Sequence, residues 1–252
     1  MRSPLPFPGS LNNWSLAVID EKKRTGASRQ ALVVAIDGPA GAGKSTVAKS
    51  VARQFDYTYI DTGAMYRSVG VLATEAGLAL DDAVGLAALV GEMEFDFPWQ
   101  GEELQTVVGA RNLSRAIRSP EAAMNASTVS KVVEVRAALV ERQRRMGQNG
   151  GVVMEGRDIG TVVFPDAELK VFLSASAEVR GKRRWLQMRE RGQSAELAEV
   201  IAEVERRDEQ DRNRAVAPLV PAKDAVILDT SGLSLEAVVD RLGTLVQARL
   251  RK

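Results

Sequence analysis

Nine consecutive residues have the types and spacing of a phosphate-binding loop. They read Gly-Pro-Ala-Gly-Ala-Gly-Lys-Ser-Thr, which fits a glycine, four residues, a second glycine, a lysine and then serine or threonine. The glycines permit a tight turn in which successive backbone N–H groups point at one anion. Lys44 would add positive charge beside the β- and γ-phosphates, and the Ser45 hydroxyl would bind Mg²⁺. The residues predicted to bind a nucleoside triphosphate are Gly38, Pro39, Ala40, Gly41, Ala42, Gly43, Lys44, Ser45 and Thr46.

The segments on either side of this loop are those that such a loop requires. Residues 33–37 are mostly apolar and β-branched, which predicts a strand buried on both faces. An amphipathic run ending near Phe55 predicts a helix whose positive N-terminal end faces the same anion. A plain glycine-rich turn between a strand and a helix is the alternative, but the motif in this context favours nucleotide binding.

The chain contains no histidine and no cysteine among its 252 residues. This composition excludes Ser-His-Asp triads, imidazole bases, thiol catalysis, disulfides and metal sites built on either residue type. Chemistry must therefore come from Asp, Glu, Lys, Arg and backbone dipoles. Phosphoryl transfer tolerates that limit best, because it depends mainly on positioning and charge neutralisation.

Net charge and hydrophobicity narrow the class of protein further. The formal net charge is +1, so no overall basic field would attract nucleic acid. Hydrophobic residues make up 45% and charged residues 27%, which is ordinary for a soluble globular protein, and no apolar run is long enough to span a membrane. We expect a cytoplasmic monomer that acts on small molecules, without nucleic acid or membrane.

Strand-like and helix-like segments alternate along residues 31–252, which predicts an α/β fold with a parallel sheet flanked by helices. Further strands are expected at residues 57–60, 152–154, 169–173 and 225–229, and helices include 64–76, 129–146 and 235–250. Two additions to this core are predicted: an insert of about residues 63–150, with a small β-hairpin from 93–97 and 104–108, and a helical lid of about residues 180–218. The proline-rich residues 1–30 are expected to form a flexible extension.

Two arginines follow predicted strands at the edge where such sheets bind ligands. Arg67 comes just after residues 57–60, and Arg157, with Asp158, comes just after residues 152–154. Arg157 can hold a phosphate with two N–H donors, and Asp158 can accept hydrogen bonds. A structural ion pair is the alternative for each of these residues taken alone.

The lid segment is dense in arginine, with acidic residues interspersed. For most of these arginines we expect a solvated pair of helices joined by ion pairs. Arg207, Asp211 and Arg214 differ, because their spacing places them on one helix face. A lid that closes over bound nucleotides would use them. Arg67, Arg157 and Arg214 give three arginines for an anionic acceptor, which favours a nucleoside monophosphate over a neutral sugar.

Four segments carry longer motifs than the phosphate-binding loop alone. They are residues 38–46, the run Asp-Thr-Gly-Ala-Met-Tyr-Arg at 61–67, the run Gly-Arg-Asp-Ile-Gly-Thr-Val-Val-Phe-Pro-Asp at 156–166, and residues 207–219. These segments resemble bacterial cytidylate kinases, and the resemblance extends from about residue 32 to the end. The second and third segments are more specific than the loop. The resemblance implies a P-loop kinase fold and transfer of the γ-phosphoryl group from ATP, with Mg²⁺, to CMP or dCMP.

The resemblance also implies a role for individual residues. Lys44, Arg157 and Arg214 would be catalytic, and Arg67 would join the two arginines on the acceptor phosphate. Arg207 and Asp211 would hold the sugar, while Ser127, Arg136 and Asp158 would read cytosine. Asp61 and Thr62, in the same motif as Arg67, would complete the substrate-binding set. The chemistry agrees, because the exocyclic amine of cytosine can donate to a carboxylate whereas uracil presents a carbonyl there.

Two features depart from the family pattern. Gln210 stands where relatives often carry another lid arginine, and residues 1–30 have no counterpart. Two other functions stay open at this point. One is a kinase for another monophosphate, such as UMP. The other is a nucleotide-dependent switch without a small-molecule acceptor, although a switch needs no second anion site.

Overall fold

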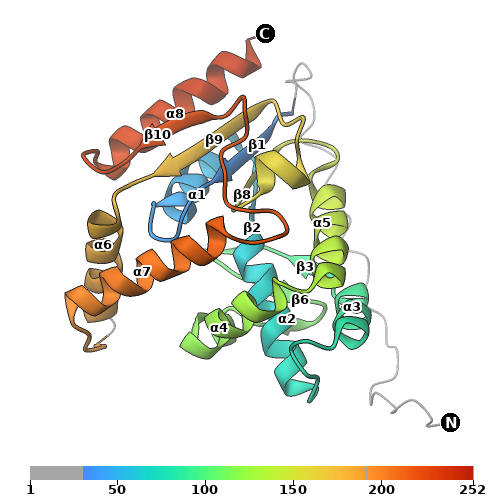
Figure 1. Cartoon of the computed structure of the whole chain (residues 1–252). Helices are drawn as coiled ribbons and strands as arrows, with labels where there is room; N and C mark the ends of the chain where they lie inside the picture. The colour runs from blue at the N-terminus through green and yellow to red at the C-terminus, as the bar shows by residue number, and fades with distance from the viewer. Residues whose placement is uncertain (1–30, 191, 252) are drawn as a thin grey trace, which may run out of the picture.

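A five-stranded parallel sheet, in the order β10-β9-β1-β8-β2, forms the centre of the molecule (Figure 1). The computed structural model describes residues 31–190 and 192–251. The predicted N-terminal extension lies outside the described residues. The strands are β1 (Val33–Asp37), β2 (Thr58–Asp61), β8 (Val152–Gly156), β9 (Leu169–Ser174) and β10 (Val226–Asp229).

The two central strands that carry the site are buried along their whole length. Every residue of β1 and of β8 is buried, as the apolar, β-branched sequence of β1 predicts. Their register pairs Asp37 with Gly156. The phosphate-binding loop after β1 and the Arg157–Asp158 pair after β8 therefore start side by side at one edge of the sheet.

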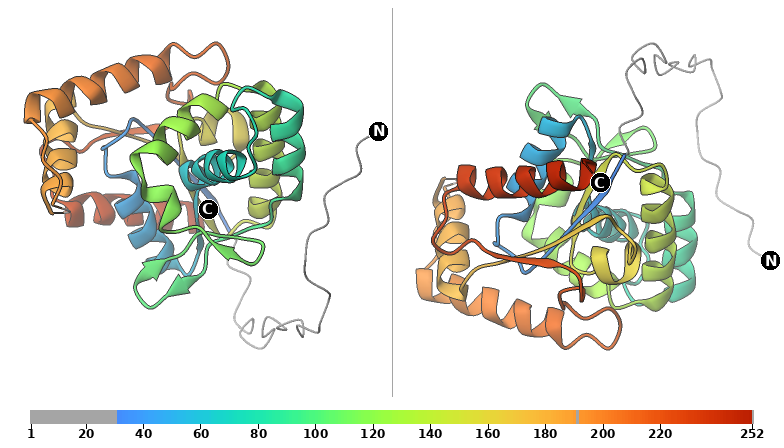
Figure 2. Two further views of the ribbon diagram at one scale, coloured as in Figure 1. Left: turned by 90° about the horizontal axis from the view of Figure 1, so that it is seen from below. Right: turned by 90° about the horizontal axis from the view of Figure 1, so that it is seen from above.

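Helices cover both faces of this sheet. Helix α1 (Lys44–Phe55) packs against α8 (Leu235–Leu250) on one face, and a short π-helix, η3 (Ile159–Val163), lies on the other (Figure 2). The expected helix at residues 235–250 is confirmed. No helix within the described ranges combines the length and apolarity needed to cross a bilayer.

Residues between β2 and β8 form a separate group of helices with small antiparallel sheets. The predicted hairpin is confirmed, because Phe95 pairs with Val108 and Asp96 with Val107. A further strand extends that pair on one side, and another two-stranded ladder forms its tip. The elements are α2 (Thr62–Glu75), α3 (Ala83–Glu92), β3 (Phe95–Asp96), β4 (Trp99–Gln100), β5 (Glu103–Leu104), β6 (Val107–Val108), β7 (Arg111–Asn112), η2 (Ala116–Arg118), α4 (Pro120–Val129) and α5 (Val133–Gly147).

The expectation of one helix over residues 129–146 is wrong at its start. Helix α4 ends at Val129 and α5 begins at Val133. The Ser130 hydroxyl donates to the Ser127 carbonyl, and Val132 has extended backbone angles, so the chain turns between the two helices. This turn places Ser127 and Arg136 on different helices.

The arginine-rich segment forms the expected helix pair, α6 (Ala177–Glu190) and α7 (Leu197–Arg212). The two helices approach so closely at Gly181 that a Cβ on this residue would lie 2.4 Å from Ile201 Cγ1. A buried ion pair of 2.5 Å joins Arg180 on α6 to Asp208 on α7. Arg207 and Asp211 lie within α7, whereas Arg214 lies just past its end.

Candidate active site

The phosphate-binding loop adopts backbone angles that favour glycine. Gly38, Gly41 and Gly43 have φ values of 145°, 78° and 91°. At Gly38 a Cβ would also lie 2.1 Å from the Leu173 carbonyl oxygen of β9. Gly38 is therefore required both by its backbone angle and by the close packing of the loop on the neighbouring strand.

Lys44 is held inside the loop at the first residue of α1. It is 6% exposed, and its Nζ donates to the Pro39 carbonyl at 2.8 Å. Burial, together with the charge of Arg157, lowers the pKa of Lys44 to about 7. An anionic ligand in the loop would restore the charged form, because it offsets the cost of burying the ammonium group.

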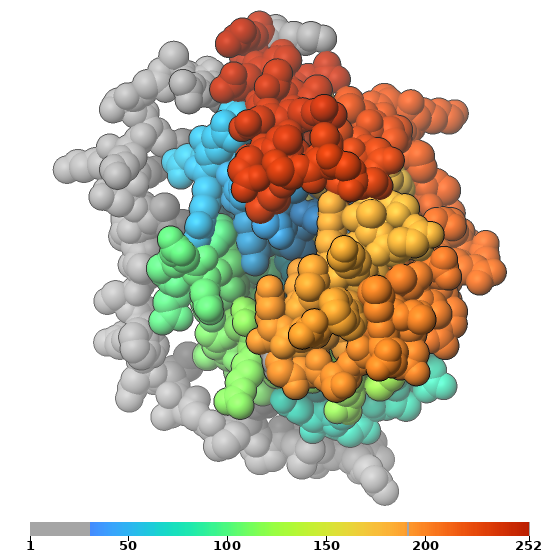
Figure 3. Space-filling view, turned by 90° about the vertical axis from the view of Figure 1, so that its left-hand side faces the viewer, coloured from blue at the N-terminus to red at the C-terminus, as the bar shows by residue number. Residues whose placement is uncertain are grey.

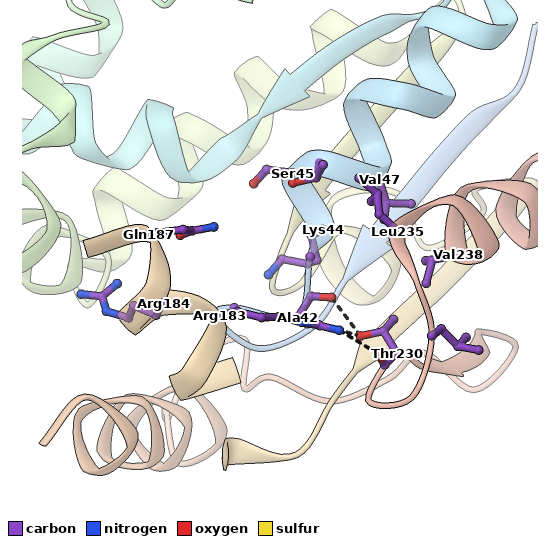
Figure 4. A pocket seen from close by; sticks show the side chains of 14 residues that line it. Ala42, Lys44, Ser45, Val47, Arg183, Arg184, Gln187, Thr230, Leu235 and Val238 are labelled. Atoms are coloured by element: carbon purple, nitrogen blue, oxygen red, sulfur yellow. Dashed lines mark hydrogen bonds between the residues drawn. The ribbon is translucent and has the colours of Figure 1, made fainter. Parts of the chain in front are cut away.

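A cavity of about 580 Å³ opens on one side of the loop (Figures 3 and 4). In Figure 3 the blue residues of α1 lie at the bottom of a recess between α8 and the lid helices. Figure 4 shows Thr230 at its wall, where the hydroxyl accepts from Arg183 at 3.1 Å and shares its hydrogen between the carbonyls of Ser174, at 3.1 Å, and Ala42, at 3.3 Å. The lining continues with apolar Leu233, Leu235 and Val238.

A second cavity, of about 430 Å³, opens on the other side of Lys44 and Ser45. Besides the phosphate-binding loop, its walls come from β2, α2, α4, α5, β8 with the segment after it, α6, and α7 with the segment after it. All of the predicted substrate-binding side chains line it: Asp61, Thr62, Arg67, Ser127, Arg136, Arg157, Asp158, Arg207, Asp211 and Arg214. Of the loop residues, Gly38 and Pro39 line neither cavity.

Asp211 orients two of the predicted phosphate-binding arginines. Its carboxylate accepts from Arg157 Nε at 2.7 Å and also pairs with Arg214. Burial would raise the pKa of Asp211, but the charges of Arg157, Arg214 and Arg207 outweigh burial and lower it. The carboxylate therefore stays ionised and holds both guanidinium groups at the cavity wall.

Asp61 anchors the third arginine and begins α2. One carboxylate oxygen accepts from the Ala64 amide at 2.8 Å as a helix cap, and the other pairs with Arg67 at 3.1 Å. Thr62 is positioned differently, because its hydroxyl donates to the Glu155 carbonyl of β8 at 2.7 Å. The start of α2 is thus fixed both to its own cap and to the neighbouring strand.

The far end of the second cavity holds a buried ion pair between Arg136 and Asp158. Burial raises the pKa of Asp158, against the opposing charges of Arg136, Arg214 and Arg157. The Arg136 guanidinium also lies 5.8 Å from the ring centre of Tyr66. Burial raises the pKa of Tyr66 to about 12, so its hydroxyl stays protonated. Ser127 lines the same cavity from α4.

Four of the eight lid arginines that the structure describes form ion pairs, and only the pair of Arg212 with Asp208 has the i,i+4 spacing that was expected. Arg184 pairs with Glu203 at 3.0 Å, and Arg212 with Asp208 at 3.9 Å. Arg184 also lines both cavities. Arg207 lines the second cavity, where burial and the nearby Arg157 lower its pKa to about 10. An anion between Arg157 and Arg207 would relieve their mutual repulsion.

Two oxygen groups beside the loop fit a magnesium ion. Ser45 lines both cavities, and the buried Glu155 carboxylate, on the neighbouring strand, lines the second one. Tyr59 donates its hydroxyl to Glu155. Burial, with the charge of Asp61, raises the pKa of Glu155, and a cation would reverse that effect. Alcohol and carboxylate oxygens are the hard ligands that Mg²⁺ prefers.

Sequence reasoning missed several side chains that line the two cavities. Glu155 and Tyr66 could have been identified, because Glu155 ends a buried parallel strand and Tyr66 stands beside Arg67 in a predicted motif. Arg183 and Arg184 were indistinguishable from other lid arginines. Thr230 carries no signal in sequence, since it reaches the loop only through the pairing of β10 with β9.

Comparison with known proteins identifies the family. Residues 34–248 match the family model described as cytidylate kinase. A cytidylate kinase of Geobacter sp. (strain M21) is 51% identical over 87% of this chain and 94% of its own length, and one of Geobacter sulfurreducens is 48% identical over 89% and 97%. A solved shikimate kinase from Bacteroides thetaiotaomicron covers 86% of this chain and 98% of its own at 16% identity, with a TM-score of 0.46. The sequence matches show that the chain belongs to the cytidylate kinase family.

Proposed function

We propose that the protein transfers the γ-phosphoryl group of ATP to CMP or dCMP, giving ADP and CDP or dCDP. One observation carries this proposal: the two cavities share Gly41, Lys44 and Ser45 of the phosphate-binding loop. A triphosphate entering from one side and a monophosphate entering from the other would meet at these residues. The geometry suits direct transfer between two bound nucleotides, because the reacting groups would be held in line at one place.

The arginines of the second cavity would hold the acceptor phosphate. Arg157 and Arg214, both oriented by Asp211, offer fixed N–H donors, and Arg67 adds a third from α2. At neutral pH a monophosphate oxygen is already ionised, so transfer needs no protein base. Charge neutralisation by Lys44, the loop amides and these arginines would supply most of the rate enhancement.

The Arg136–Asp158 pair would select the base. Cytosine offers an amine donor next to ring acceptors, which suits a carboxylate beside a guanidinium group. Uracil would place a carbonyl against Asp158 and leave two acceptors facing each other. Because the pair is buried, such a mismatch is costly. Ser127 offers a further hydroxyl to the base, and Arg207 and Asp211 would contact the sugar.

Ser45 and Glu155 would hold Mg²⁺ at the loop. When bound, the ion would supply positive charge that offsets the negative charge of the terminal phosphates of ATP. The α6–α7 pair would act as a lid, and residues of about 63–150 as the monophosphate-binding insert, which together exclude water from the reacting groups. We further propose a cytoplasmic monomer that acts on nucleotides alone.

The test is ADP formation from ATP and Mg²⁺ with CMP, dCMP, UMP, AMP and GMP in turn. We expect fast turnover with CMP and dCMP and slow turnover with the others. Equal turnover with UMP would retain the kinase and reject cytosine selection. If no monophosphate stimulated ADP formation, the proposed function would be rejected in favour of a nucleotide-dependent switch.

A further inference from the structure

A buried carboxylate at the end of β1 binds the segment that carries Arg157 and Asp158. Asp37 is 4% exposed. Its two oxygens accept from the backbone N–H groups of Ile159, at 2.8 Å, and Gly160, at 2.7 Å. Asp37 directly precedes the phosphate-binding loop. One side chain therefore joins the start of that loop to the segment that supplies the second cavity.

The bonds of Asp37 replace a cap that Asp158 does not make. Asp158 is the residue before the π-helix η3, where an aspartate ordinarily accepts from amides of the first turn. Asp158 makes no such bond, and its carboxylate pairs with Arg136 in the second cavity instead. Asp37 accepts from the first two amides of η3, those of Ile159 and Gly160, and the Gly160 amide is one that a capping aspartate could otherwise bind. The capping function has thus been separated from the residue in the capping position.

The packing around Asp37 leaves little room for the segment to shift. A Cβ added at Gly160 would lie 3.4 Å from an Asp37 oxygen and 3.2 Å from two side-chain carbons of Lys170. The Asp158 carbonyl accepts from the amides of Val162 and Val163 at 2.9 and 3.2 Å, which are bonds of the first turn of η3. The backbone around Asp158 is therefore fixed both by Asp37 and by the first turn of η3, while the Asp158 carboxylate faces the second cavity.

We infer that Asp37 is a positioning residue for base selection. By capping η3 it leaves the Asp158 carboxylate free to face Arg136 and the base of the acceptor. This inference rests on the proposed function, in which Asp158 reads cytosine. Without Asp37 the open amides would compete for the Asp158 carboxylate, because unpaired buried N–H groups are costly. The preference for CMP over UMP would then fall although no group touching the substrate had been changed.

The test compares Asp37→Asn with the unchanged enzyme and with Asp82→Asn. Asparagine retains one acceptor but turns an N–H₂ group toward the other amide. We expect the CMP-to-UMP ratio of kcat/KM to fall about tenfold, mainly through KM for CMP. ADP affinity in the absence of acceptor should stay within about twofold, because the loop amides are unchanged. Asp82→Asn is the matched control, since Asp82 also accepts a backbone N–H, that of Gly85 at 3.0 Å, but lies outside the second cavity.

A double-variant cycle separates positioning from a general loss of stability. Combined with Asp158→Ala, the Asp37→Asn change should no longer alter the CMP-to-UMP ratio, because the group that it positions is gone. If the two changes affected the ratio independently, or if Asp37→Asn left it unchanged, the inference would be overturned. Failure of the unchanged enzyme to phosphorylate CMP would instead reject the proposed function, before any variant was compared.

Amide hydrogen exchange tests the contact without any substrate. In the unchanged protein the amides of Ile159 and Gly160 should exchange slowly, and Asp37→Ser, which retains one small acceptor, should accelerate them selectively. The same measurement serves if Asp37→Asn does not fold. Rapid exchange of both amides in the unchanged protein would contradict the capping contact and the inference with it.

Discussion

The two cavities that meet at Lys44 are built in different ways. The loop side of the first cavity comes from one continuous stretch of chain. Its glycine backbone angles turn successive N–H groups toward the cavity, where they can bind phosphate. The second brings charged side chains together from six separate segments of the chain. A backbone site needs only a local motif, whereas a side-chain site needs the fold to bring its members together.

Because the two cavities are built differently, substitutions in them should have different effects. Around the second cavity several charged groups are paired with another residue of the site: Asp211 pairs with Arg157 and Arg214, Asp61 with Arg67, and Asp158 with Arg136. Removing one member leaves a buried charge unpaired and changes its neighbours as well. Changes at the loop should act on bound phosphate directly. Changes at the second cavity should act on the acceptor and leave nucleotide binding at the loop intact.

Replacing Lys44 by alanine should have the largest effect, because this residue faces both cavities. We expect kcat to fall about 10³-fold, since the charge beside the transferring group is lost. The thermal midpoint should not fall, because an ammonium group whose burial is costly is removed. A coupled assay of ADP release measures the rate, with exposed Lys182→Ala as the control. Turnover close to that of the control would refute the role of Lys44.

Replacing Arg157 by alanine should affect only the acceptor side. We expect kcat/KM for CMP to fall about 10²-fold or more, because two donors to the acceptor phosphate are lost and Asp211 loses a partner. ADP binding, measured by calorimetry, should change little. Arg145→Ala removes a half-exposed arginine that pairs with Glu141 at 3.9 Å and is the control. An equal loss of ADP affinity would show that the two cavities are not separable.

Replacing Asp158 by alanine should change selection more than rate. The CMP-to-UMP ratio of kcat/KM should fall by about 10- to 100-fold, because the carboxylate that would accept from the cytosine amine is removed. Arg136 would remain buried without its partner, so some loss of stability should accompany the change. Competition between the two substrates in one reaction gives the ratio directly. An unchanged ratio would count against base reading by Asp158.

The smallest expected effect is a proton taken up when nucleotide binds. Above pH 7 the empty site holds Lys44 largely neutral, because its pKa is about 7, and bound phosphate raises that pKa again. Binding at pH 8 should therefore take up a fraction of a proton, and this contribution should vanish near pH 6, where Lys44 is already charged. Calorimetry of ADP binding in two buffers of different ionisation enthalpy measures it. Lys44→Arg, which stays charged, should abolish the uptake, and persistence in that variant would assign it to another group.

Sequence reasoning located the strands that carry the site, and it failed where helices break without a strong signal. The strand at residues 33–37 was predicted correctly because a run of buried apolar residues leaves few alternatives. The helix expected at residues 129–146 was predicted to start four residues too early, because no glycine or proline marks the break between α4 and α5. Tertiary packing and the Ser130–Ser127 bond end the first helix there.

What the sequence alone determined is the chemistry at the loop, because nine consecutive residues fix a backbone shape and a charge wherever the chain places them. It also indicated, by motif, which side chains belong to the acceptor. Only the tertiary structure decided their partners: that Asp211 orients two arginines, that Thr230 reaches the loop, and that Asp37 caps the segment after Asp158. The hydrogen bonds of Arg157 with Asp211, of Ile159 with Asp37 and of Thr230 with Ala42 join residues that are 54, 122 and 188 positions apart. Sequence spacing cannot predict them, because the register of parallel strands sets which residues meet at the edge of the sheet.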